Sequence, residues 1–227
     1  MRLGRCTWPQ LERAAASRLL IPLGATEQHG PQLPLETDTI IATAIADVAA
    51  AERADVVVAP ALPYGASGEH ADFAGTLSLG RAALEEALVE LVRSADAFDG
   101  VVIMSWHGGN AEPVSRAVAR SRRDGRHVFY WCPRVEGGDA HAGRVETSLM
   151  LAIAPELVGD ARPVGATEPL EALMPALRER GVRAVSGSGV LGDARAASAR
   201  EGRELLMALV ADLDAFLERT GPAAVAR

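Results

Sequence analysis

Side chains able to bind metal gather near the start of the chain, where Glu27, His29 and Asp38 fall within twelve residues. Each offers an oxygen or nitrogen donor, and such a mixed set suits Zn²⁺, Mn²⁺ or Fe²⁺ better than Ca²⁺. A further imidazole, His107, is followed by two glycines, whose missing Cβ lets the backbone approach a ligand closely. These residue types predict a metal centre assembled from distant segments.

A third cluster pairs His141, in a glycine-rich turn expected over residues 136–142, with Glu146 at the start of a helix. A histidine exchanges protons near neutral pH, so we expect His141 to act as a general acid or base beside a metal-activated water. Glu146 could be a further metal ligand, or it could only complement the positive end of the helix dipole.

Polar residues of a glycine-rich loop, together with neighbours of His107, are candidates to line a substrate pocket. The candidates are Tyr64, Ser67, Glu69, His70, Trp106 and Asn110. His70 could instead be a solvated loop residue, and Asn110 could only cap the helix that follows it.

Each cluster alone also allows a plainer explanation. Glu27 and Asp38 could cap a helix while His29 is a solvated side chain. The glycine turn after His107 could bind phosphate, although it matches no dinucleotide fingerprint and no P-loop lysine follows. A non-catalytic protein that binds a metal or a nucleotide therefore stays open at this point.

Alternating apolar runs and helical patterns predict the elements that position these clusters. Strands are expected at 19–24, 55–60, 101–104 and 127–131. Helices are expected at 38–51, 81–98, 112–123, 145–153, 170–180 and 196–217, the first capped by Thr37 or Asp38. This alternation predicts a three-layer α/β/α sandwich with a mostly parallel central sheet. Such sheets bind ligands beyond the carboxyl ends of their strands, where the clusters lie.

Length and composition restrict the class of protein. The 227 residues are expected to form one domain, 1–227, with 1–16 and 220–227 peripheral. A hydrophobic content of 48% with only 4% aromatic residues predicts a core mostly of alanine, valine and leucine. A net charge of −7 disfavours a nucleic-acid partner, because phosphate binding needs clustered basic residues.

Cysteine use and the N-terminal residues bear on the cellular compartment. Cys6 and Cys132 are far apart and show no metal-type spacing, so a disulfide framework is not expected. The first residues lack the apolar core of a signal peptide, and no apolar run reaches the length of a membrane span. We therefore expect a cytoplasmic protein without a membrane partner.

Taken together and in order, the motifs resemble the creatininase (creatinine amidohydrolase) family. The matching segments are 22–30, 34–38, 107–110, 141–148 and 189–193, spread over roughly residues 17 to 205. Within the family, residues 64–70, 73–76 and 137–139 are most similar to the branch of peptidases found in mycofactocin systems.

The resemblance implies a hydrolase with two divalent metal ions, Zn, Fe(II) or Mn, acting on amide bonds. It implies that Glu27, Asp38 and His107 hold one ion, that His29 and Asp38 hold the other, and that Asp38 bridges them. His141 would protonate the leaving nitrogen. The implied substrate is a modified precursor peptide that loses its C-terminal Val-Tyr, and the implied assembly is a homo-oligomer, possibly a hexamer.

Two positions depart from the family pattern. Creatininase itself has a glutamate two residues after the strand-end histidine, where this chain has Gly109, and Glu146 could fill that gap. The family commonly reads Asn-Gly before the histidine, whereas this chain has Ser105 and Trp106, which could alter the pocket floor. A cyclic amidohydrolase or deformylase acting on another small amide substrate, of the creatinine or formamidopyrimidine type, stays open.

Overall fold

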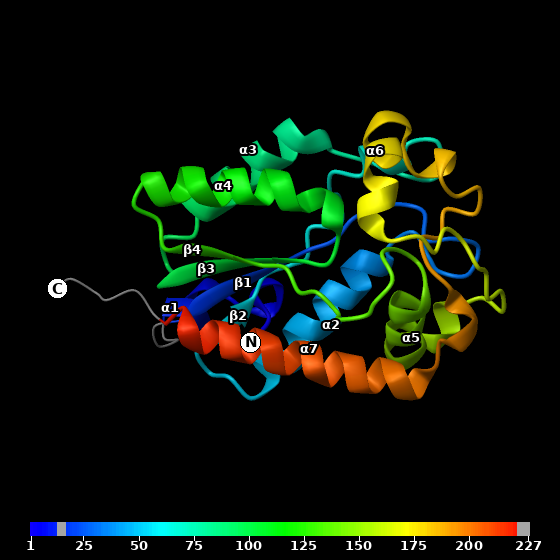
Figure 1. Cartoon of the computed structure of the whole chain (residues 1–227). Coiled ribbons are helices and arrows are strands. Elements are labelled where there is room, and N and C mark those ends of the chain that lie inside the picture. Colours follow the sequence, from blue (N-terminus) through cyan, green and yellow to red (C-terminus); the bar gives the residue numbers. More distant parts are fainter. Residues whose placement is uncertain (13–16, 222–227) are drawn as a thin grey trace.

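The computed structural model describes residues 1–12 and 17–221. Within them, four parallel strands form one sheet in the order β2-β1-β3-β4, with helices on both faces (Figure 1). The strands are β1 (Arg18–Leu23), β2 (Val56–Val58), β3 (Gly100–Ser105) and β4 (Val128–Trp131). The expected α/β/α sandwich with a parallel sheet is confirmed.

Six of the seven described helices lie where a helix was predicted, whereas the short helix α1 was not predicted. They are α1 (Trp8–Glu12), α2 (Thr37–Ala51), α3 (Gly80–Arg93), α4 (Ala111–Arg123), α5 (Arg144–Ile153), α6 (Leu170–Arg180) and α7 (Ala199–Arg219). Short 3₁₀ turns lie at Leu3–Arg5, Gly68–His70, Gly108–Asn110, Pro155–Leu157, Val182–Ala184 and Ala194–Ala196. Among the described helices, none combines the length and apolar character needed to cross a bilayer.

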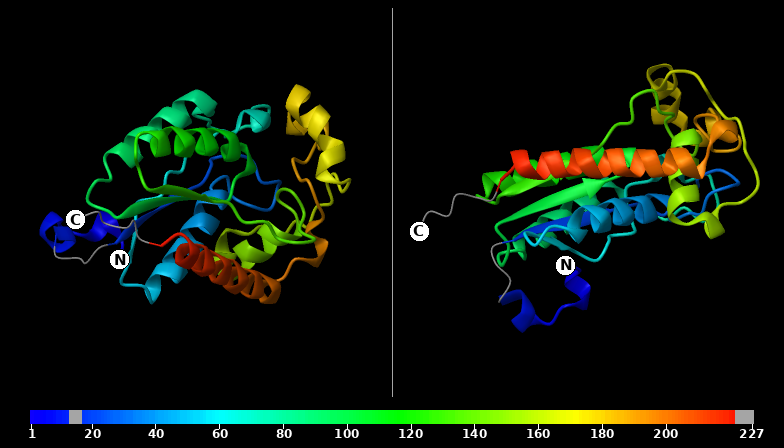
Figure 2. Two further views of the ribbon diagram at one scale, coloured as in Figure 1. Left: turned by 60° about the vertical axis from the view of Figure 1, so that its left-hand side comes forward. Right: turned by 90° about the horizontal axis from the view of Figure 1, so that it is seen from below.

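Alternate residues of each strand pack into two separate hydrophobic cores, because successive side chains point to opposite faces of a sheet. Leu20, Val102 and Met104 pack with α2, α5 and α7 on one face. Ile21 and Ile103 pack with α3 and α4 on the other. Figures 1 and 2 show these two helical layers, with α6 at one end of the molecule, away from α1.

Two predicted helix ends and one predicted helix cap were wrong. Helix α3 ends at Arg93, and the Ser94 hydroxyl donates to a carbonyl of its last turn. Helix α7 begins after Ser198, whose hydroxyl accepts the backbone N–H of Glu201. Glu36, rather than Thr37 or Asp38, occupies the cap position of α2 without a side-chain capping bond.

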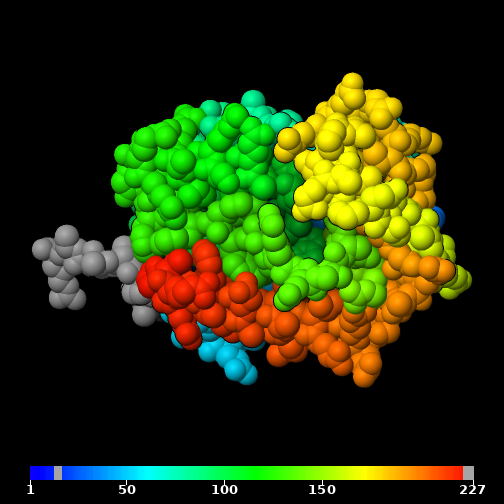
Figure 3. All heavy atoms as spheres, in the orientation of Figure 1, coloured from blue at the N-terminus to red at the C-terminus, as the bar shows by residue number. Residues whose placement is uncertain are grey.

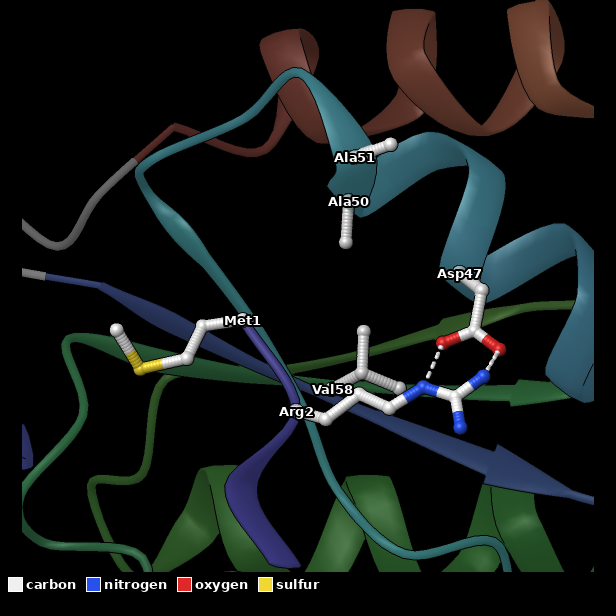
Figure 4. A pocket seen from close by; sticks show the side chains of 6 residues that line it. All are labelled: Met1, Arg2, Asp47, Ala50, Ala51 and Val58. Atoms are coloured by element: carbon white, nitrogen blue, oxygen red, sulfur yellow. Dashed lines mark hydrogen bonds and ion pairs between the residues drawn. The ribbon is translucent and has the colours of Figure 1, made fainter. Parts of the chain in front are cut away.

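The N-terminal residues lie beside β2 and line a small cavity (Figure 4). The backbone N–H of Val58 donates to the carbonyl of Met1, and Arg2 forms an ion pair with Asp47. These side chains border a cavity of about 280 Å³ near the end of α2. Asp47 lies about 13 Å along the helix from Asp38, at 1.5 Å per residue. The cavity is therefore remote from the predicted metal ligands.

The chain ends and the two cysteines were also the subject of predictions. Of the segments expected to be peripheral, 13–16 and 222–227 lie outside the described residues. Cys6 and Cys132 are both free thiols, as expected.

Helices α5 and α7 approach closely at Gly202. A Cβ built on Gly202 would lie 1.8 Å from the carbonyl oxygen of Ser148 and 2.9 Å from the Cβ of Ala152. The Ser148 hydroxyl also contacts Glu201 at 3.0 Å and accepts the backbone N–H of Ser198 at 3.0 Å. This contact fixes α5, the helix that carries Glu146, against the longest helix of the fold.

We predict that Gly202→Ala lowers stability, although alanine favours a helix interior over glycine by about 1 kcal/mol. The added methyl group must push α7 away from α5, and overpacking of this kind costs about 1–3 kcal/mol. Urea denaturation followed by circular dichroism measures the change. Arg203→Ala, on the exposed side of the same turn, is the matched control. Equal or greater stability of Gly202→Ala would show that the two helices are not in close contact there.

Candidate metal centre

Two neighbouring strands bring the first clusters together. β1 and β3 run parallel, with Leu23 in register with Ser105, so both end at the same edge of the sheet. Glu27 and His29 follow the end of β1, and His107 follows the end of β3. Asp38 lies in the first turn of α2, where the helix dipole favours a carboxylate.

One donor set combines Glu27, Asp38 and His107, all buried. His107 Nδ1 lies 3.1 Å from Glu27 Oε1 and 3.6 Å from Asp38 Oδ2. On the other side of the ring, Nε2 lies 3.1 Å from the carbonyl oxygen of Ala66, to which it can donate. That bond leaves the Nδ1 lone pair facing the two carboxylates, as a metal ligand requires.

A second donor set combines His29, Asp38 and Glu146. His29 Nε2 lies 3.3 Å from Asp38 Oδ1 and 3.8 Å from Glu146 Oε2. The other ring nitrogen, Nδ1, donates to the backbone carbonyl of Glu27 at 3.1 Å, which directs Nε2 toward the carboxylates. Each oxygen of Asp38 thus faces a different histidine, the arrangement of a bridging carboxylate.

Buried oxygens without donors indicate that cations fit here. Both carboxylate oxygens of Glu27 and Oδ2 of Asp38 are buried and meet no well-aligned hydrogen-bond donor among the described residues. Buried carboxylates in this state are costly unless a cation compensates them. Ligands about 2.1 Å from one tetrahedral ion lie about 3.4 Å apart, close to the separations found in both sets. The residues therefore fit two metal ions that share Asp38.

The pKa shifts in the cluster show that its buried carboxylates favour a nearby positive charge. Burial alone would lower the pKa of His29 and His107, but the facing carboxylates raise the pKa of each to about 10. Burial alone would raise the pKa of Glu27, yet His107, His70 and His141 hold it well below its usual value. His29 and His107 thus carry protons at neutral pH unless a metal ion displaces them.

His141 also faces this cluster, and Gln28 orients it. His141 Nδ1 lies 3.8 Å from Glu27 Oε1, and its Nε2 can donate to the carbonyl of Gln28 at 2.8 Å. The side-chain amide of Gln28 lies within 3.0 Å of His70 Nδ1 and of the Gly189 carbonyl, which take its two hydrogens. Burial lowers the pKa of His141 and lowers that of His70 to about 3, so both rings are neutral at neutral pH.

Gln28 was missed as a functional residue by sequence reasoning. Its position between two ligands was the only available signal, because its partners lie 42 and 161 residues away. A Cβ on Gly189 would lie 1.9 Å from Gln28 Oε1, so only glycine lets this segment close over the amide.

The six predicted pocket residues separate into different environments. Ser67 and His70 are buried, Glu69 is partly exposed with Oε1 3.6 Å from His107 Nε2, and Tyr64 is 43% exposed. His70 Nε2 lies 3.3 Å from Glu27 Oε1, so the ring is not a solvated loop residue.

Asn110 and Trp106 make contacts within the protein. The Asn110 amide donates to the Gly24 carbonyl and the Ser105 hydroxyl and accepts the backbone N–H of Ala66, so it braces three loops and makes no capping bond. The Trp106 indole donates to Glu146 Oε1 at 2.7 Å. Contacts of these side chains with substrate stay predictions.

A cavity lies beside α6, and short backbone segments connect its lining to the cluster. The surface is hollowed next to the yellow segment that contains α6 (Figure 3). Segments 164–168 and 185–188, which flank α6, line a cavity of about 490 Å³. Backbone bonds from Ala166 to Val190 and from Leu191 to His141 tie this lining to the metal centre.

The centre and fold have counterparts among known proteins. The sequence profile of the creatininase family, described as creatinine amidohydrolase, matches residues 4–217. A mycofactocin precursor peptide peptidase of Mycolicibacterium smegmatis is 48% identical, covering 92% of this chain and 87% of that protein. A protein of the same name from Mycobacterium tuberculosis is 46% identical, covering 92% and 88%.

Solved structures agree with the sequence comparisons. A crystal structure of creatinine amidohydrolase superposes with a TM-score of 0.83 at 26% identity, covering 98% of each chain. Two further creatininase structures, one described as Mn and one as Zn-Zn type, each give a TM-score of 0.82. The matched profile spans nearly the whole chain, and the chain therefore belongs to the creatininase family.

Proposed function

We propose that this protein is a dinuclear metallopeptidase that removes the C-terminal Val-Tyr dipeptide from a modified mycofactocin precursor peptide. The observation that carries the proposal is the buried convergence of two donor sets on Asp38. Membership of the creatininase family makes the chain a metal-dependent amide hydrolase. The peptide substrate is inferred from relatives that are 46–48% identical and bear the peptidase name.

We assign each residue a role from its position in the cluster. Glu27, Asp38 and His107 would hold one ion, and His29, Asp38 and Glu146 the other. Bound divalent ions supply a water of lowered pKa and polarise the scissile carbonyl. His141, neutral and with Nδ1 facing the cluster, would accept a proton there and deliver it to the leaving nitrogen.

The substrate would be held by surfaces outside the donor sets. The cavity lined by segments 164–168 and 185–188 is large enough for peptide side chains and adjoins Gly189, which contacts Gln28. Tyr64, which is exposed, and Glu69, which is partly exposed, would line the opposite side. Peptide binding at this opening is part of the proposal.

Gly109 disfavours a creatininase-like arrangement of ligands. A Cβ at this position would lie 2.4 Å from the Ala66 carbonyl, from Glu69 Oε1 and from His107 Nε2. A glutamate therefore does not fit there without displacing the loop. We accordingly assign the missing carboxylate to Glu146 and regard creatinine as a disfavoured substrate.

Metal identity, assembly and compartment belong to the same proposal. The donors accept Zn, Fe(II) or Mn, and availability often decides among them. A homo-hexamer follows from the resemblance, and the exposed apolar side chains Tyr64, Leu77 and Leu79 on loops near the site would suit subunit contacts. A cytoplasmic location is proposed with it.

We predict that the purified protein releases Val-Tyr from the modified precursor peptide. Mass spectrometry of both products measures cleavage, with creatinine and a formamidopyrimidine as alternative substrates. A chelator should abolish cleavage, and Zn²⁺, Mn²⁺ or anaerobic Fe²⁺ should restore it, because the buried carboxylates need a cation. Intact peptide after incubation with folded, metal-loaded protein would exclude the peptidase assignment. Chelator-resistant cleavage would exclude the metal.

His107→Ala and His141→Ala should fail in different ways. Loss of His107 removes a ligand, so we predict loss of bound metal and of turnover together. Loss of His141 should leave metal content near normal while turnover falls about 10²–10⁴-fold. Elemental analysis and the cleavage assay on the same samples separate the two. Metal loss in His141→Ala would make His141 a ligand, which its position beside Glu27 would permit.

Metal binding should release protons. His29 and His107, each with a pKa raised to about 10, must deprotonate to bind metal, so we predict about one proton released per imidazole at pH 7.5. Calorimetric titration in buffers of different ionisation enthalpy measures this number. In metal-free protein, the raised pKa values of His29 and His107 stabilise the fold. This stabilisation is fully present below pH 6.5 and is lost as pH rises through about 10.

The melting temperature of the metal-free protein, prepared with a chelator, should accordingly fall between pH 7 and pH 10. The melting temperature of the metal-loaded protein should change less. His29→Gln is the control, since it removes one of the two titrating imidazoles. A binding enthalpy independent of buffer would contradict the proton displacement.

A further inference from the structure

The carboxylate of Glu146 is held by two hydrogen bonds from different parts of the chain. The Trp106 indole N–H donates to Oε1 at 2.7 Å, and the backbone N–H of Ala142 donates to Oε2 at 2.5 Å. Oε2 also lies 3.8 Å from His29 Nε2, the nitrogen that faces Asp38. One oxygen of Glu146 is thus occupied by the indole, while the other faces the second donor set.

The backbone that supplies the second bond is itself held in a strained conformation. Ala142, with φ at 52°, is the sole non-glycine residue with positive φ among the described residues. Its carbonyl accepts the side-chain amide of Gln32 at 2.6 Å, which secures the turn. Strain of this kind persists where the surrounding structure fixes it, and here it directs an N–H toward Glu146.

Trp106 shows a different role from the other predicted pocket residues. Its ring packs against the core that contains Leu149 and Met150 of α5, and among the described residues its side chain makes one polar contact, with Glu146. A carboxylate on a helix can rotate among several positions, and a bond to one oxygen restricts that rotation. Groups that orient a metal ligand in this way typically change metal affinity 10–100-fold when removed.

We propose that Trp106 is a positioning residue for the second metal ion: its indole N–H holds Oε1 of Glu146 so that Oε2 alone binds the ion shared with His29 and Asp38. This inference rests on the proposed function, since it takes Glu146 as a ligand. It assigns Trp106 to the metal centre rather than to contact with substrate.

The test compares four variants with the wild type by metal titration after chelation. Trp106→Phe keeps an aromatic ring and removes the N–H. Trp131→Phe is the matched control, because the Trp131 ring is buried while its indole donates at 2.8 Å to Asp212, an exposed residue of α7 outside the donor sets. Glu146→Gln tests the ligand itself, and Trp106→Phe with Glu146→Gln completes a double-mutant cycle. Mn²⁺ and Zn²⁺ are added singly, and electron paramagnetic resonance of the Mn²⁺ samples reports coupled ion pairs.

Wild type and Trp131→Phe should bind two ions and show the coupled-pair spectrum. Trp106→Phe should bind the first ion normally and the second about 10–100-fold more weakly. The double variant should bind like Glu146→Gln, because Trp106 acts through that carboxylate. Where Trp106→Phe fails to fold by circular dichroism, Trp106→Met takes its place.

Unchanged binding of the second ion in Trp106→Phe, with loss of that ion in Glu146→Gln, would overturn the role of Trp106 and leave the proposed function intact. Binding of both ions by Glu146→Gln would remove the ligand assignment and the inference with it. A double variant markedly weaker than Glu146→Gln would show that Trp106 acts by another route and would also overturn the inference.

Discussion

The structure depends on compensating negative charge that is buried around Asp38. Three carboxylates, from Glu27, Asp38 and Glu146, lie within reach of two histidines, and the side chain of each is at most 11% exposed. Water cannot solvate them, so a cation must. The same negative charge raises the pKa of His29 and of His107 to about 10, so that both imidazoles bind protons at neutral pH. Divalent ions would compensate this charge more fully, since each brings two charges to a site where both oxygens of Glu27 and Oδ2 of Asp38 meet no well-aligned donor among the described residues.

The fold meets this demand for cations by placing the candidate ligands on rigid elements. The parallel register of β1 and β3 sets two strand ends side by side, and the first turn of α2 adds Asp38. Asn110 then ties both strand ends to the loop at Ala66, while the contact of Gly202 with Ser148 fixes the helix that carries Glu146. Ligands held in this way need little reorganisation when an ion binds.

Local sequence patterns predicted most of this architecture. Contacts between segments that are distant in the chain could not be predicted from the sequence. The apolar runs predicted all four strands, and the donor types at 27, 29, 38 and 107 predicted the cluster. The cap of α2 was misjudged because Asp38 looked like a capping residue, while the structure buries it facing His29. The bonds from Gln28 to His70 and from Trp106 to Glu146 span 42 and 40 residues, and no periodicity encodes such pairs.

Close contacts around Gly109 and Glu146 limit the free space on two sides of the cluster. The loop from Ala66 to Glu69 fills the space beside Gly109, so that side of His107 is closed to a ligand and to a bulky substrate. The Trp106 ring lies beside Glu146, to which its indole donates, and occupies space on a second side. On the side of α6 the surface is hollowed (Figure 3), and segments 164–168 and 185–188, which flank this helix, line a cavity of about 490 Å³. Several backbone N–H groups of this lining, Gly165 and Ala166 among them, are bonded within the protein, so under the proposed function side chains of the peptide rather than its main chain would occupy this cavity.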